Sequence, residues 1–104
     1  MLDNLRITEI AGNVVRAQVA GNRLERILAA PTTDSEGKEA LRITLVLKPD
    51  AAKELTGAQA VDVLVGIQQS LWREGEQRFP IVEYATEQEL REDEDIDRQS
   101  ENEN

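Results

Sequence analysis

The sequence predicts an α+β domain in which a mostly antiparallel sheet of four to five strands is covered by one long helix. Three observations lead to this fold class. Residues 41–47 alternate between two faces as a strand does, and residues 57–74 carry apolar side chains at helical spacing. Two Gly-Asn pairs divide the first thirty residues into short apolar segments, as tight turns divide a meander of strands.

The Gly-Asn pairs at residues 12–13 and 21–22 predict the N-terminal meander. Glycine accepts positive φ without a steric penalty and asparagine tolerates the left-handed region, so each pair suits a two-residue hairpin loop. We therefore expect strands over residues 5–10, 14–19 and 23–29. Residues 23–29 also fit one face of a short helix, and the sequence leaves that alternative open.

A hairpin and a crossover complete the expected sheet. Residues 31–39 gather turn formers and charges without periodicity, so we expect a surface loop that links two strands of a hairpin. Asp50 is expected to cap a single helical turn through Leu55. Residues 81–85 predict the last strand. A strand, a helix and a strand joined by short loops favour a right-handed crossover, which places 41–47 and 81–85 parallel in one sheet.

The long helix, expected over residues 57–74, begins at a capping box formed by Thr56 and Gln59 and ends before Gly75. Its apolar side chains fill an arc of about 200°, which is wider than one sheet face needs. Loops that fold over the helix explain this arc, and we favour that interpretation slightly, with Trp72 in the core; the alternative is that one flank of the arc is an interface with a second subunit or a partner. Gly66 lies on the polar side of the helix, and we favour a surface glycine there over the alternative, a close approach of another backbone. The candidate interface residues are Val61, Val65 and Trp72.

Negative charge is concentrated at the end of the chain, whose 104 residues carry a net charge of −9. Residues 87–104 hold nine acidic residues and two arginines, and therefore −7 of that total. A run of one sign repels itself and stays open, whereas a folded domain tolerates mixed charge. We expect a single α+β domain over residues 1–90 and a disordered acidic tail over 91–104. A second capping box, formed by Thr86 and Glu89, predicts a short fraying helix between the two.

The composition leaves few routes to catalysis or metal binding. The chain contains no cysteine and no histidine, which removes thiolate nucleophiles, disulfides, the commonest general base and the commonest zinc ligand. The acidic loop 34–37 lacks the acids that an EF-hand loop needs, and Gly37-Lys38 lacks the context of a phosphate-binding loop. We therefore expect no catalytic site, no cofactor and no metal.

One pair of polar residues remains a candidate for catalysis. Glu83 is the only carboxylate within an apolar predicted strand, and Tyr84 is its neighbour. A buried glutamate beside a phenol is suited to general acid–base chemistry. The simpler interpretation is that Glu83 lies in water, paired with Arg42 or Arg78, because no second catalytic element is visible. A small enzyme that uses Glu83 and Tyr84 is the third of three functional hypotheses.

The first hypothesis is a non-catalytic protein-binding or assembly module that associates with a second copy of itself as a homodimer. The second is an acidic regulator that docks a basic protein through its C-terminal tail. The excess of acid argues against binding nucleic acid, whose phosphates require clustered Lys and Arg. The start of the chain lacks a secretory signal and no apolar run is long enough to span a membrane, so we expect a cytoplasmic protein with no membrane partner.

Overall fold

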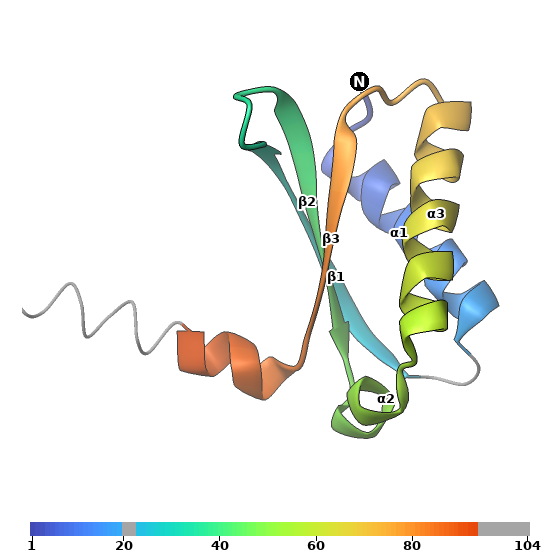
Figure 1. The fold of residues 1–104 in the computed structure, drawn as a ribbon, viewed down its shortest axis with the longest axis vertical. Helices are drawn as coiled ribbons and strands as arrows, with labels where there is room; N and C mark the ends of the chain where they lie inside the picture. Colours follow the sequence, from blue (N-terminus) through green and yellow to red (C-terminus); the bar gives the residue numbers. More distant parts are fainter. Residues whose placement is uncertain (20–22, 94–104) are drawn as a thin grey trace, which may run out of the picture.

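The computed structural model describes residues 1–19 and 23–93 of the chain. In that part of the chain the protein has three strands and four helices (Figure 1). The α+β class is confirmed, but the sheet has three strands instead of four to five, and more than one helix covers it. The elements are α1 (Asn4–Gln18), β1 (Leu24–Thr33), β2 (Glu39–Leu47), α2 (Pro49–Glu54), α3 (Gly57–Arg73), β3 (Phe79–Ala85) and a helix at 87–93.

β2 is the central strand of a mixed sheet with the order β1-β2-β3. β1 pairs antiparallel with β2, whereas β3 pairs parallel with it, so the sheet is mixed instead of mostly antiparallel, and the expected parallel pairing of residues 41–47 with 81–85 is confirmed. The hairpin loop expected over residues 31–39 is shorter in the structure, because residues 31–33 belong to β1 and residue 39 to β2, which leaves 34–38 as the turn. There the carboxylate of Asp34 accepts hydrogen bonds from the backbone N–H groups of Glu36 and Lys38, and Gly37 adopts a φ of 81°.

The predicted N-terminal meander is wrong, because residues 4–18 form α1 instead of two strands. The carboxylate of Asp3 accepts a hydrogen bond from the N–H of Arg6 at 2.8 Å and so caps the helix. Residues 12–13 lie inside the helix, and residues 20–22 lie outside the described residues. The apolar side chains recur at helical spacing and are buried against the rest of the fold. They are Ile7, Ile10, Ala11 and Val15.

The structure settles one open alternative near β2 and corrects one prediction. The alternative left open for residues 23–29 is settled in favour of a strand, β1. Asp50 does not cap the helix that follows β2. Lys48 is the N-cap of α2 and makes no side-chain capping bond, while Pro49 lies in the first turn, where its missing N–H and fixed φ favour a helix start. Asp50 lies in the same turn, where its charge is stabilised by the positive end of the helix dipole.

α3 begins at the predicted capping box, in which Thr56 and Gln59 each accept a backbone N–H from the other. It ends before Gly75, whose φ of 89° is the left-handed conformation expected there. Gly66 is not the surface glycine that we expected. A Cβ at this position would lie 2.7 Å from Cγ1 of Val14, so the missing side chain allows α1 to approach α3 closely.

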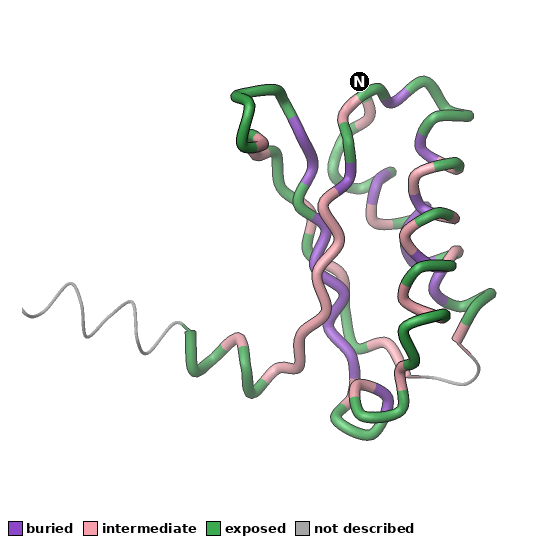
Figure 2. The backbone as a smooth tube through the Cα atoms, in the orientation of Figure 1, coloured by how far each residue is buried: buried purple, intermediate pink, exposed green. Residues whose placement is uncertain are grey.

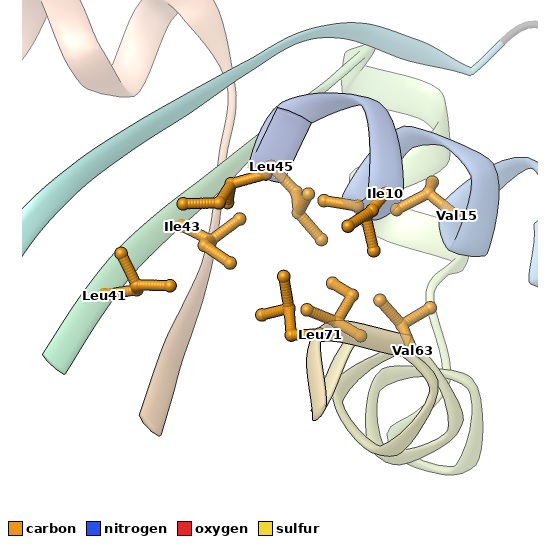
Figure 3. Close-up of a cluster of buried hydrophobic side chains, with 10 residues drawn as sticks. Ile10, Val15, Leu41, Ile43, Leu45, Val63 and Leu71 are labelled. Atoms are coloured by element: carbon orange, nitrogen blue, oxygen red, sulfur yellow. The ribbon is translucent and has the colours of Figure 1, made fainter. Parts of the chain in front are cut away.

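α1 and α3 lie side by side on one face of the sheet, and helix 87–93 leaves β3 on the other side (Figure 1). Burial is concentrated along the middle of the sheet and on the helix faces turned toward it (Figure 2). Aliphatic side chains from α1, β2 and α3 fill the space between the two layers (Figure 3). The buried members are Ile7, Ile10, Ala11, Val15, Leu41, Ile43, Leu45, Val63, Ile67 and Leu71.

The second predicted capping box is confirmed at the start of helix 87–93, where Thr86 and Glu89 exchange hydrogen bonds. The acidic tail expected over 91–104 falls mostly outside the described residues, because 91–93 continue this helix and the description ends there. Among the helices that the structure describes, none combines the length and the hydropathy required to cross a membrane.

Candidate functional site

The two polar candidates, Glu83 and Tyr84, lie on opposite faces of the sheet because they are successive residues of β3. The carboxylate of Glu83 accepts hydrogen bonds from Nε and Nη2 of Arg42 at 3.1 and 2.9 Å on the face away from the helices. The hydroxyl of Tyr84 donates to the backbone carbonyl of Ala60 in α3 at 3.2 Å, and burial raises the pKa of this phenol. The structure therefore does not bring the two side chains together as an acid–base pair.

In the acidic loop 34–37, the carboxylate of the first residue, Asp34, accepts hydrogen bonds from the backbone of the same turn. These two hydrogen bonds, from the N–H groups of Glu36 and Lys38, stabilise the hairpin turn in the manner of an Asx turn. Within residues 1–19 and 23–93, no three carboxylate, imidazole or thiol side chains gather closely enough to hold a metal ion.

The structure reveals a buried ion pair that the sequence did not predict. Glu76, in the connection between α3 and β3, is 1% exposed, and Nε and Nη2 of Arg78 donate to its two carboxylate oxygens at 3.0 and 2.8 Å. The same pair binds the start of the chain. Glu76 accepts the backbone N–H of Leu2 at 2.9 Å, and Nη2 of Arg78 donates to the carbonyl of Leu2 at 3.1 Å.

The hydrogen bonds from Arg78 lower the pKa of Glu76 to about 2, although burial of the carboxylate acts in the opposite direction. Glu76 is therefore ionised and saturated with donors at neutral pH, which suits a structural clamp and not proton transfer. Two open hollows of about 410 and 450 Å³ lie beside the pair and share Met1, Glu39 and Arg78. The charge of Arg78 is already balanced by Glu76, so the guanidinium of Arg78 is not free to bind an anionic ligand in these hollows.

The remaining predicted residues form an exposed stripe on α3. Val61, Val65 and Trp72 are 58%, 41% and 54% exposed, and we call them the α3 stripe. At about 100° per residue they lie within about 40° of one another around the helix axis. They therefore lie along one flank of the helix instead of being scattered around it.

The position of the α3 stripe follows from the neighbours of α3. Gly66 faces α1, which lies over β1, whereas Ala60 contacts Tyr84 of β3. Going around the helix axis from Gly66 past the buried face, one meets Leu64, then Gln68 and then the stripe. The stripe therefore does not face α1. The stripe therefore lies on the β3 side of the molecule, where the structure describes no further element.

Other exposed apolar side chains do not form a comparable surface. Leu28 of β1 and Phe79 of β3 point to the sheet face away from the helices, but the strand register places Arg42 between their rows. The ion pair of Arg42 with Glu83 thus interrupts that face. Leu5 is exposed on α1. Of the apolar surfaces in the described part of the chain, the α3 stripe is the best candidate for binding.

Comparison with known proteins assigns no family to the chain. No protein-family model, curated protein or solved structure matches it. Its function is therefore inferred from the residues and contacts described above.

Proposed function

We propose that this chain is a non-catalytic protein-binding module that assembles with a second copy of itself through the α3 stripe. The observation that supports the proposal is the exposure of three large apolar side chains on a flank of α3 that neither α1 nor the sheet covers. Removing apolar surface from water favours association, against the entropy that association costs. Tryptophan provides a large rigid area and is enriched among the residues that dominate interfaces.

A second copy is the partner that best fits the composition of the stripe. A two-fold axis brings the same patch of both copies together, so the patch must tolerate contact with itself. The α3 stripe contains no charged residue, so contact between two stripes is apolar, although each copy carries a net charge of −9. Apolar contact on α3 is compatible with this overall charge because the acidic residues are concentrated at 87–104.

The proposal is tested by light scattering and sedimentation of the full chain over a wide concentration range. Trp72→Gln should weaken the dimer at least tenfold, because it removes the largest side chain of the stripe. Leu5→Gln is the matched control, since Leu5 is also an exposed apolar residue on a helix but lies outside the stripe. A wild-type chain that stays monomeric at every concentration, or equal effects of the two variants, would contradict the proposal.

A second candidate function rests on the charge distribution. The net charge of −7 over residues 87–104 suits an acidic regulator that docks a basic protein, and such attraction weakens as salt is added. The third candidate, an enzyme that uses Glu83 and Tyr84, has less support because the sheet separates the two side chains.

A further inference from the structure

Two exposed charges of opposite sign lie beside the α3 stripe. Asp62 and Arg73 are exposed, and at about 100° per residue they lie within about 20° of each other around the helix axis, between the stripe and Gly66. Along the axis they are about 16 Å apart, so they do not pair within one copy. Among the residues that the structure describes, Asp62 and Arg73 take part in no ion pair. Their charges are therefore available to a partner of α3.

A two-fold axis can bring two copies of the α3 stripe together with the helices antiparallel or parallel. In the antiparallel orientation the same flank of each helix meets, and Asp62 of one copy lies beside Arg73 of the other. In the parallel orientation each flank meets the opposite flank of the second copy, which carries Leu64 and Gln68 instead of a charge. Antiparallel helices therefore form this ion pair twice in each dimer, whereas parallel helices do not form it.

We infer that two copies of the chain pair through α3 in the antiparallel orientation, and that reciprocal contacts between Asp62 and Arg73 select this orientation. The inference rests on the proposed self-assembly and specifies its geometry. An exposed ion pair contributes little to affinity, which the apolar stripe provides. Charges at the rim of an interface act mainly on its orientation and register, because wrong arrangements leave them unpaired or opposite a like charge.

The sizes of the stripe side chains suit the same orientation. With the two-fold axis between residues 66 and 67, Trp72 of one copy lies opposite Val61 of the other, and the two copies of Val65 lie near the axis. A large side chain then faces a smaller one, as interdigitated packing requires. Parallel helices would instead bring the two Trp72 rings together at one end of the interface and leave the valines apart at the other.

The acidic C-terminal residues also favour antiparallel helices. The hydrogen bond from Tyr84 to Ala60 places the end of β3 beside the start of α3, and residues 87–104 follow β3 with nine acidic residues and two arginines (Figure 1). Parallel helices would start both acidic segments at the same end of the dimer. Antiparallel helices separate the two starting points by about 20 Å along the axis, which exceeds the Debye length of about 8 Å at physiological ionic strength.

The chain's own C-terminal residues are a poor occupant of the α3 stripe. Residues 94–104 contain five acidic residues and a single apolar residue, Ile96. One apolar side chain does not cover three exposed ones, and the charge of this segment has the same sign as Asp62. A second α3 provides a matching apolar stripe and one charge of each sign beside it.

Charge reversals in the full chain test the ion pairs, with the dissociation constant of the dimer measured by sedimentation. Asp62→Arg and Arg73→Asp should each raise this constant about tenfold, because each turns two attractions in the dimer into two repulsions. The double variant should return to near the wild-type value. Net charge alone does not produce this pattern, since the two single variants change it in opposite directions. Glu25→Arg, an exposed reversal on β1, is the control and should not weaken the dimer. Single reversals that dimerise as tightly as this control, or a double variant that stays weak, would overturn the ion pairs.

The orientation itself is measured by electron paramagnetic resonance between spin labels in the dimer. The chain has no cysteine, so Ala58→Cys and, separately, Gln69→Cys each place one label per copy at an exposed position of α3. Antiparallel helices should separate the labels by about 25 Å along the axis at residue 58 but by only about 8 Å at residue 69, whereas parallel helices give a short distance at both. A short distance at residue 58 in a proven dimer would overturn the orientation but leave self-assembly intact, and the absence of any dimer would refute both.

Discussion

Glu76 is the residue whose protonation most directly affects the fold. Its pKa is lowered to about 2 from an ordinary value of 4.5, because Arg78 donates hydrogen bonds to the ionised carboxylate. A lowered pKa in the folded state means that folding favours the charged form. The resulting stabilisation is fully present above pH 4.5 and is lost as the pH falls toward 2. The clamp on Leu2 weakens over the same range.

The corresponding prediction compares wild type with Glu76→Gln by chemical denaturation over the acidic range. At neutral pH the free energy of unfolding of the variant should be about 3 kcal/mol lower than that of wild type, because Arg78 is left as a buried charge without its partner. As the pH falls from 4.5 toward 2, the wild type should lose stability more steeply than the variant, so the two curves converge. Parallel curves would show that Glu76 does not carry this pH dependence.

The elements that the sequence predicts well are those whose signals are local. β2 follows from strict alternation, and α3 follows from its capping box and terminal glycine. α1 does not follow from its local turn signal. The Gly12-Asn13 pair suits a hairpin, but burial of a helical apolar face against the sheet outweighs that preference.

The candidate sites also divide into those that local sequence signals indicate and those that depend on contacts between distant residues. The wide apolar arc of α3 identifies Val61, Val65 and Trp72 as candidates, but the same arc fits loops folded over the helix, so only the exposure of these side chains in the structure decides between the two. The Glu76–Arg78 clamp is not predictable, because its function depends on Leu2, which is 74 residues away along the chain. Gly66 was misjudged for the same reason, since only the packing of α1 shows what its missing side chain makes room for.

Gly66 gives a prediction about the packing of α1 on α3. Gly66→Ala gains about 1 kcal/mol of helix propensity but forces a methyl group against Val14, an overpacking that costs about 1–3 kcal/mol. The variant should therefore be less stable by about 1 kcal/mol in thermal or chemical unfolding. In a Val14→Ala background the same change should be stabilising, because the clash is gone. Gly57→Ala, with open space around the new methyl group, is the control and should change stability little.

At the scale of the whole molecule, self-assembly must overcome electrostatic repulsion. Each copy carries a net charge of −9, and residues 94–104 account for five acidic residues against one arginine. Repulsion between two acidic chains is screened by salt, whereas apolar contact is not. The self-assembly and tail-docking hypotheses therefore differ in the sign of their salt dependence.

The last prediction uses this difference. Self-association of the full chain should become tighter as ionic strength rises from about 0.01 M to about 0.1 M, because the Debye length shortens from about 30 to about 10 Å. A variant in which the five acids of residues 94–104 become amides should dimerise more tightly at low salt and respond less to added salt. Both effects are measured by sedimentation equilibrium. Association that weakens with salt, or that disappears in the amide variant, would instead mean that the acidic residues themselves make the contact, as tail docking requires.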